Sequence, residues 1–523
     1  MKNFKWLSIL MFSALLVLSA CSDSTTESSS KENTSVEDKD YSELQVAYNA
    51  QPPTMDPLMT TAVATRDVAR NVFESLVTLD ADSKVVPMLA ESYEESEDGK
   101  IITFKIRQGV KFHNGDEMTA DDVVASMEHW RTTTALGKAN FADATFVKVD
   151  ETTVELVMQQ KLFIALHLLA DPSQIAMITT EEVIESATAE GITEFIGTGP
   201  YKFVEWKNDQ YIHLQKFEDY KAVETPANGL AGKKEAKYEN VYFQFVTDAS
   251  TRLAGIQTGE YDVANAIPFD NVEQLNSLDN LTTSVDHNGF NAIVFNKRSG
   301  IFADKTARQA VNAALDEEAI LTAAFSNSQF YELESGLMIK EQTDWYSDAG
   351  SDQYNQNNPE KAKALLKEIG YNGEEVVILS TRDYEDHYNA AVVVQQQLES
   401  IGINAKLDIY DWPTVLERRT DETAYDIFIT GFPTEPVPNK YVFLDSRGGW
   451  AGWTNSPEID ALLDKIATAS SQEEATNTYS ELMEEYYDYL PIIKFGNKTT
   501  VTAYDSSIEG YDFLQGIILW NMK

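Results

Sequence analysis

Cysteine and histidine are scarce in this chain of 523 residues, which contains one Cys and six His. A single thiol cannot form a disulfide within the chain, so the fold requires no disulfide framework. The six His never recur at spacings of three or four residues. Without clustered His or Cys, an all-protein zinc or nickel site is not expected. The sequence therefore predicts neither a metal centre nor another cofactor.

Basic residues are also few, with 41 Lys and Arg against 84 Asp and Glu and a formal net charge of −43. Nucleic acid and anionic bilayers both repel such a surface, so nucleic acid is excluded as a natural partner. We interpret the acidity as a solubility adaptation of an exported protein. The chain is 43% hydrophobic and long enough to bury large cores in about two to four domains.

Catalytic and nucleotide-binding signatures are missing as well. The chain has no G-x-S-x-G, H-E-x-x-H, Walker A or Rossmann glycine pattern. The turn Gly197–Tyr201 superficially resembles a phosphate loop, but Pro200 lacks an N–H and no Lys-Ser/Thr follows. Asp344, Asp348 and Asp352 lack the Gly and Glu of a calcium loop. We therefore predict that the protein is not an enzyme.

An apolar run begins close to Met1. Lys2 and Lys5 give the N-terminus a positive charge, and the mainly apolar stretch Trp6–Leu18 follows them. This stretch is too short for a comfortable membrane span. Residues 1–20 are therefore predicted to be an export signal. Leu-Ser-Ala-Cys21 is typical of a lipobox, and we expect Cys21 to be lipidated and to anchor the protein. An ordinary secretory signal with a chance Cys is the alternative. Residues 21–40 are polar and are predicted to be a flexible tether.

The most regular patterning lies in residues 87–130. Apolar and polar residues alternate over residues 101–106, which is the period of a half-buried strand. Asp98-Gly99 before it is a turn dipeptide, because Gly tolerates positive φ. Thr119, with Asp122 three residues later, predicts the capped start of a helix.

The order of these elements resembles a block of the family 5 extracellular solute-binding proteins, the receptors of peptide, dipeptide and nickel ABC importers. The family block reads AxSYExSxDGKxxTFxLRxGVKFHxGxxxTAxDVVxS, and Ala90–Ser126 follows it with few departures. Gly197–Tyr201 is similar to the family's GTGPY turn, and Arg252–Asp262 and Ala307–Asp316 are similar to two of its helices. The resemblance covers residues 44–523.

The resemblance implies an α/β fold of the two-lobe, periplasmic-binding-protein type II class, with an extra small domain inserted in the first lobe. Its domains are expected to be discontinuous: residues 41–67, 196–289 and 492–523 in lobe I, 68–195 in the small domain and 290–491 in lobe II. Periodicity adds two local predictions. Arg66–Leu79 has the spacing of an amphipathic helix. Val376–Leu379, a following helix and Ala405–Ile409 predict a parallel βαβ unit, with Ile427–Thr430 as a further strand.

The resemblance also implies a function. Such a receptor closes two lobes around one (oligo)peptide and delivers it to an ABC permease and ATPase complex. We expect a monomer anchored through Cys21 on the outer face of the cell membrane of a Gram-positive bacterium, or on the periplasmic side in a Gram-negative one. Two alternatives stay open: the same fold binding a metal chelate or other small solute, and a surface signalling or adhesion lipoprotein without a transport role.

Candidate ligand contacts come from two regions. The loop Asn49–Thr54 matches the family's cleft loop after the first strand, with a Pro-stiffened surface turn as the alternative. Aromatic residues follow the predicted strand at 427–430, where open α/β sheets place ligand sites, with ordinary core packing as the alternative. The predicted contacts are Asn49, Gln51, Pro52, Asn291, Gly431, Phe432, Pro433, Glu435, Trp450 and Trp453.

One departure concerns the ligand's amino group. The family's peptide binders carry an acidic residue in a GWxxDYxDP loop that pairs with the free N-terminus of the peptide. This chain reads Gly431-Phe-Pro-Thr-Glu-Pro436, in which Glu435 matches the second acidic position and not the amine anchor. The resemblance therefore does not imply that a free peptide N-terminus is recognised.

Overall fold

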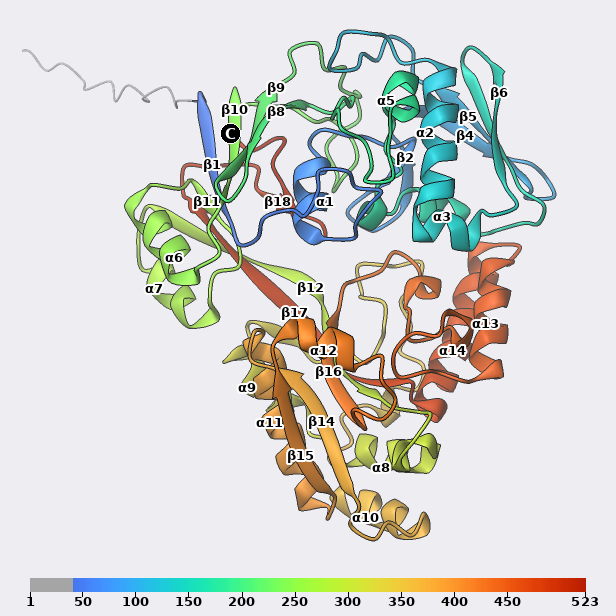
Figure 1. Ribbon diagram of the computed structural model, residues 1–523, viewed down its shortest axis with the longest axis vertical. Coiled ribbons are helices and arrows are strands. Elements are labelled where there is room, and N and C mark those ends of the chain that lie inside the picture. The colour runs from blue at the N-terminus through green and yellow to red at the C-terminus, as the bar shows by residue number, and fades with distance from the viewer. Residues whose placement is uncertain (1–40) are drawn as a thin grey trace, which may run out of the picture. The chain divides into compact units, whose positions relative to one another are not determined.

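The computed structural model describes residues 41–523. The predicted signal peptide, Cys21 and the predicted tether lie outside the described residues. The described chain forms two lobes joined by two long antiparallel strands, β12 (Leu281–Phe295) and β17 (Ile492–Asp505), which cross between them (Figure 1). We call residues 41–280 and 506–523 the first lobe and residues 296–491 the second lobe.

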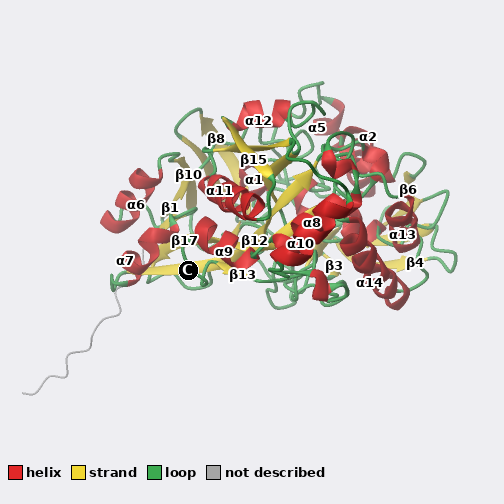
Figure 2. Ribbon diagram, turned by 90° about the horizontal axis from the view of Figure 1, so that it is seen from below, coloured by secondary structure: helices red, strands yellow, loops and turns green. Residues whose placement is uncertain are grey.

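An eleven-stranded sheet runs through both lobes, in the order β15-β14-β16-β12-β17-β11-β1-β10-β9-β8, with β13 paired to β17. In the first lobe, β1 pairs in parallel with β10 and β11. Helices α6 and α7 lie beside this end of the sheet (Figures 1 and 2). The first-lobe elements are β1 (Glu43–Tyr48), α1 (Val63–Ala69), β2 (Val77–Leu79), β3 (Val85–Pro87), β8 (Tyr201–Lys207), β9 (Tyr211–Lys216), β10 (Asn240–Phe245), α6 (Ala249–Thr258), β11 (Val263–Ala264), α7 (Val272–Asn276), β18 (Asp512–Phe513) and β19 (Ile517–Ile518).

The inserted part of the first lobe has its own sheet, in the order β4-β5-β7-β6. The predicted capping box is present, because the Thr119 side chain accepts from the Asp122 N–H while Asp122 accepts from the Thr119 N–H. The helix that follows buries Val123, Met127 and Trp130, as its spacing predicts. The elements here are β4 (Ala90–Glu95), β5 (Ile101–Ile106), α2 (Ala120–Thr133), α3 (Ala135–Asn140), β6 (Thr145–Asp150), β7 (Thr153–Val157), α4 (Ala165–Leu169) and α5 (Glu181–Glu185).

The predicted helix over Arg66–Leu79 is wrong beyond its first turn, since α1 begins at Val63 and ends at Ala69. The carbonyls of Asn71 and Val72 instead accept from the N–H groups of Tyr201 and Gly199, at 3.1 and 2.9 Å. The glycine is required there, because a Cβ on Gly199 would lie 2.4 Å from the Asn71 carbonyl oxygen. The Gly197–Tyr201 turn thus packs against the chain after α1 and supplies the hydrogen-bond donors that a continued helix would otherwise provide.

The second lobe confirms the predicted βαβ unit. Strands β14 and β15 are parallel and joined by α11, and β16 is parallel to β14. Helices α13 and α14 lie side by side (Figures 1 and 2). The elements are α8 (Lys305–Ala314), α9 (Glu317–Phe325), β13 (Tyr331–Glu332), α10 (Pro359–Glu368), β14 (Glu375–Thr381), α11 (Glu385–Ser400), β15 (Asn404–Tyr410), α12 (Trp412–Arg418), β16 (Ile427–Phe432), α13 (Pro457–Ala467) and α14 (Gln472–Tyr489).

The crossing strands carry the connection between the lobes. Residues 281–287 of β12 pair with the end of β17. Phe290–Phe295 pair with β16, and residues 290–294 also pair with the first half of β17. The register shifts between His287 and Phe290 and again after Asn291, so bulges lie midway along the crossing. The domain boundary predicted at residue 290 falls inside β12, and the predicted boundaries stay a prediction.

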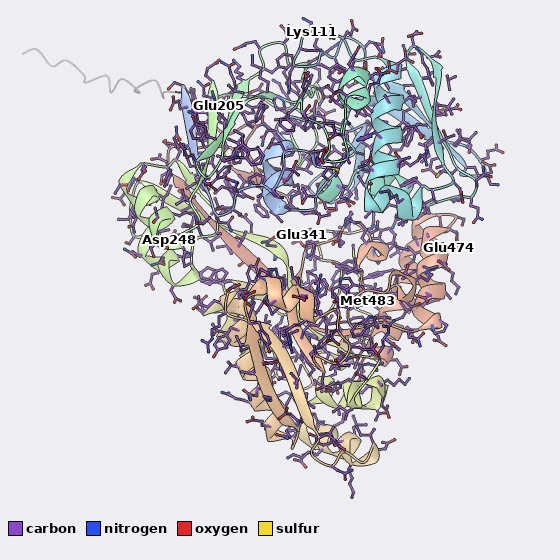
Figure 3. All side chains as sticks on the ribbon, viewed as in Figure 1. Lys111, Glu205, Asp248, Glu341, Glu474 and Met483 are labelled. Atoms are coloured by element: carbon purple, nitrogen blue, oxygen red, sulfur yellow. The ribbon has the colours of Figure 1, made fainter. Side chains whose placement is uncertain are left out.

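Carboxylates cover the exterior while the helices bury their apolar faces. Asp248, Glu341 and Glu474 are exposed and come from widely separated parts of the chain, whereas Met483 on α14 is buried (Figure 3). Among residues 41–523, no helix combines the length and the apolar character that a membrane crossing requires.

Candidate functional site

A groove with about 1190 Å³ of empty space lies against the crossing strands and is lined from both lobes. We call it the interlobe groove. Its first-lobe wall is the segment that follows β11, and its second-lobe walls are the end of α9 and the start of α11. Its lining residues are Ala266–Asp270, Asn288, Ala324–Ser326, Asp383–Asp386, Asn389 and Lys498–Val501.

The segments that follow two strands, β14 and β11, supply side chains to this groove. Strand β14 ends at Thr381, and the turn into α11 supplies Asp383 and Asp386 at the carboxyl end of the strand. Open α/β sheets place their ligands beyond such strand ends. From the other lobe, β11 ends at Ala264, and the chain leads directly into Ala266–Asp270. The groove is therefore a product of the sheet topology.

The most organised polar cluster joins two groove-lining residues, Asp386 and Lys498, to Asn291. The Asp386 carboxylate accepts from Asn291 Nδ2 at 2.7 Å and lies 3.7 Å from Lys498 Nζ. Burial alone would raise the pKa of Asp386, but Lys498, His387 and Asn291 together lower it below its usual value. Burial lowers the pKa of His387 to about 4, so this imidazole is neutral at pH 7. Asn291 Oδ1 is buried and has no hydrogen-bond partner in the described chain.

Negative charge dominates the groove. Asp270, Asp383, Glu385 and Asp386 line it, and Lys498 is the ammonium group among its lining residues. Two of the carboxylates already accept hydrogen bonds, Asp270 from Ser326 and Asp383 from the Trp412 N–H. An excess of carboxylates favours ligands with cationic or hydrogen-donating groups.

Three of the predicted contacts lie at the margin of the groove. Asn291 and Gly431 are register partners on β12 and β16. A Cβ on Gly431 would lie 2.9 Å from both Asn291 Oδ1 and Lys498 Nζ, so this face of β16 borders the Asp386 cluster. Asn49 exchanges hydrogen bonds with Asn265, the residue before the first-lobe wall. None of the three is itself a lining residue.

The other predicted contacts lie elsewhere. Gln51 Oε1 accepts from the Asp209 N–H at 2.6 Å, Pro52 is buried and Pro433 is exposed. Phe432 points to the opposite face of β16 from Gly431 and packs on Trp450 at 5.6 Å between ring centroids. Trp453 stacks on Tyr425. These aromatic contacts are those of a packed cluster, and their role in ligand binding stays a prediction.

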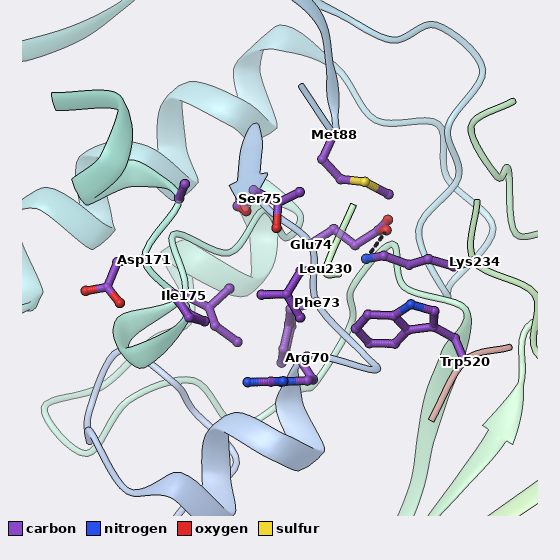
Figure 4. A pocket seen from close by; sticks show the side chains of 13 residues that line it. Arg70, Phe73, Glu74, Ser75, Met88, Asp171, Ile175, Leu230, Lys234 and Trp520 are labelled. Carbon is purple, nitrogen blue, oxygen red and sulfur yellow. Dashed lines mark hydrogen bonds and ion pairs between the residues drawn. The ribbon is translucent and has the colours of Figure 1, made fainter. Parts of the chain in front are cut away.

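Glu435 has an internal partner. Its carboxylate lies 2.7 Å from Lys440 Nζ, and the same ammonium contacts Asp171 of the first lobe. Burial raises the pKa of Glu435 to about 7. Asp171 also borders a separate first-lobe cavity, in which Glu74 and Lys234 form a buried ion pair with Lys234 Nζ over the Trp520 ring (Figure 4).

Sequence reasoning missed Asp386 and Lys498. Asp386 had a usable signal, because it begins a helix just after a predicted parallel strand, where ligand sites lie. Lys498 had none, since a Lys within a long strand is ordinary for an exposed face. The pairing order β14-β16-β12-β17 in the shared sheet brings Asp386, just after β14, and Lys498, on β17, to within 3.7 Å.

Comparison with known families decides what kind of protein carries this groove. The sequence model of the bacterial extracellular solute-binding proteins, family 5 Middle, matches residues 84–455. The chain belongs to this family. Its members are extracellular or periplasmic solute-binding receptors of ABC importers and not enzymes. Membership confirms the resemblance drawn from Ala90–Ser126.

Similar family 5 proteins span almost the whole chain. The chain is 29% identical over 491 residues, 90% of its length and 91% of the relative, to the probable peptide ABC transporter periplasmic-binding protein y4tO of Sinorhizobium fredii. The structure of AgaA from A. tumefaciens R10 in complex with agropinic acid has a TM-score of 0.74 at 27% identity and covers 92% of this chain and 98% of AgaA.

A second structure agrees in fold. AppA of Bacillus subtilis in complex with a nonapeptide has a TM-score of 0.74 at 24% identity, covering 92% of this chain and 97% of AppA. Both neighbours are two-lobe, type II periplasmic binding proteins, which confirms the predicted fold class.

Proposed function

We propose that this family 5 receptor is lipid-anchored, captures an (oligo)peptide in the interlobe groove and delivers it to an ABC permease. The observation that carries the proposal is a groove lined from both lobes around the crossing strands. A solute there contacts both lobes at once, so it stabilises the closed arrangement over any in which they separate. The acidic lining suits the N–H groups and cationic side chains of a peptide.

Blocking the groove tests the proposal. We expect Asn288→Trp, which places an indole on an exposed groove position, to weaken peptide binding by tenfold or more, about 1.4 kcal/mol. Ser400→Trp is the matched control, because it adds the same indole at the other end of α11, about 22 Å from the groove end of that helix. Isothermal titration with a peptide that native mass spectrometry finds bound to the purified receptor measures both. Equal peptide affinities of Asn288→Trp and Ser400→Trp would show that the interlobe groove is not the binding site.

The same mass spectra separate the alternative cargoes. A retained metal chelate or other non-peptide solute would keep the groove as the site and replace the peptide. If the purified receptor retains no solute and binds none of the peptides in a library, the result would favour the surface signalling or adhesion role.

The anchor has its own test. Cys21 is the one thiol of the chain and closes the predicted lipobox, so we expect Cys21→Ala to release the protein from membranes into the medium. Fractionation followed by a carbonate wash measures the release. A variant that stays with the membrane after the wash would contradict lipidation at this residue.

A further inference from the structure

Lys440 places its ammonium between two carboxylates that come from different lobes. Nζ lies 2.7 Å from Glu435 Oε2 in the second lobe and contacts Asp171 Oδ2 in the first. It also lies 3.1 Å from Ser173 Oγ. The three charged side chains are 10%, 15% and 0% exposed for Lys440, Glu435 and Asp171, so they form a largely buried cluster.

Other contacts hold both residues in place. Asp171 caps the short turn that follows it, accepting from the Ser173 N–H at 2.8 Å and from Ser173 Oγ at 2.9 Å. The Glu435 carbonyl accepts from Gln342 Nε2 at 2.7 Å, and Pro436 stiffens the next step of the chain. Asp171 is therefore held through its carboxylate and Glu435 through its backbone, both by contacts that do not involve Lys440.

Two nearby donors, Arg66 and Tyr441, have other partners. Arg66 is close enough to influence Glu435, but its Nε pairs with Asp67 at 3.0 Å. Tyr441 donates its hydroxyl to the Leu337 carbonyl. Burial alone would lower the pKa of Lys440, but Asp171 and Glu435 raise it to about 12. The Lys440 ammonium is thus the shared ion-pair partner of the Asp171 and Glu435 carboxylates.

We propose that Lys440 acts as an internal ligand, filling a two-carboxylate cation site between the lobes and barring the ammonium or guanidinium group of a solute from it. Lys440 is then a specificity-determining residue. The inference rests on the proposed function, because it concerns which cargo this interface accepts. Cationic groups of a cargo are directed to the interlobe groove and not to Glu435 and Asp171.

Removing the side chain should open the site to an external cation. Lys440→Ala leaves a space that matches n-propylammonium. We expect this ion to raise the melting temperature of Lys440→Ala by about 2–4 °C relative to sodium chloride at the same ionic strength. The parent should not respond. The double variant Lys440→Ala/Glu435→Gln should lose most of the response, because it lacks one of the two carboxylates.

An exposed lysine supplies the matched control. Lys340 also bridges two carboxylates, Glu332 at 2.8 Å and Glu334 at 3.0 Å, but its side chain is 53% exposed. Lys340→Ala should gain nothing from propylammonium. Equal responses of the two alanine variants, or no response of folded Lys440→Ala, would overturn the proposal. If Lys440→Ala does not fold in sodium chloride, its refolding yield is measured with and without propylammonium instead. A higher yield with propylammonium would then support the proposal, and an unchanged yield would overturn it.

Peptide binding gives a second arm. N-terminal acetylation of the peptide should cost Lys440→Ala at least tenfold more affinity than it costs the parent, about 1.4 kcal/mol. Equal losses in the two proteins would show that removing Lys440 opens no carboxylate to the ligand and would overturn the inference. If neither protein binds peptide, the peptide assignment fails, and the propylammonium response still decides the role of Lys440.

Discussion

Replacing Lys234 by Met is expected to lower the free energy of unfolding by about 3–5 kcal/mol. Lys234 Nζ lies 2.9 Å from Glu74 Oε1, and the two side chains are 5% and 1% exposed. The remaining partners of Glu74 are the hydroxyls of Tyr220 and Thr198, which do not neutralise its charge. The variant would therefore leave a buried carboxylate without a cation.

The adjacent lysine is the control. Lys233 pairs with Glu235 at the surface, where its side chain is 48% exposed. Exposed pairs contribute about 0–1 kcal/mol, so Lys233→Met should change the stability little. Urea unfolding of both variants measures the difference. Adding Glu74→Gln to Lys234→Met should recover part of the loss, and a Lys234→Met loss no larger than that of Lys233→Met would contradict the buried pair.

Acidification from pH 6.5 toward 4 should destabilise the protein steeply. Burial lowers the pKa of His113, His167 and His387 to about 4 in each case, against an ordinary value of 6.5. Between these values the unfolded chain binds protons that the folded chain does not. The contribution is therefore fully present above pH 6.5 and is lost as the pH falls toward 4, by about 3 kcal/mol for each His.

His113 shows why the folded state resists protonation. Its Nδ1 accepts from the Gly197 N–H at 3.2 Å, and Nε2 faces the Gly199 carbonyl at 3.0 Å. This arrangement fits the neutral imidazole and would lose its acceptor on protonation. We expect His113→Gln to flatten the dependence of the unfolding free energy on pH, measured by urea titrations across this range. Exposed His287→Gln is the control, and parallel curves for the two variants would contradict the assignment.

Local chemistry determines much of the fold, and the sequence could therefore predict it. The Thr119 capping box, the βαβ unit of β14, α11 and β15, and the alternating strands of the first lobe depend on neighbours within a few residues or on a period of two. The helix over Arg66–Leu79 failed because its outcome depends on a partner more than a hundred residues away, the turn at Gly197–Tyr201, which takes the carbonyls of Asn71 and Val72.

The site was less predictable for the same reason. Gly431 and Phe432 are neighbours in sequence but face opposite sides of β16, so only one of them borders the groove. Asp386 and Lys498 meet through the pairing of strands that are far apart in the chain. Whether Glu435 is open to a ligand depended on Lys440 and Asp171, and no local pattern links those three residues.

The crossing of β12 and β17 limits how this receptor could be divided or rearranged. Both connections between the lobes run inside a shared sheet, where β17 pairs with β12 along most of its length. Separating the second lobe as an independent protein would cut both strands and expose two unpaired edges, which promote aggregation. The lobes are therefore unsuitable as exchangeable modules, and chimaeras between relatives should place their junctions in surface loops and leave both crossing strands with one parent.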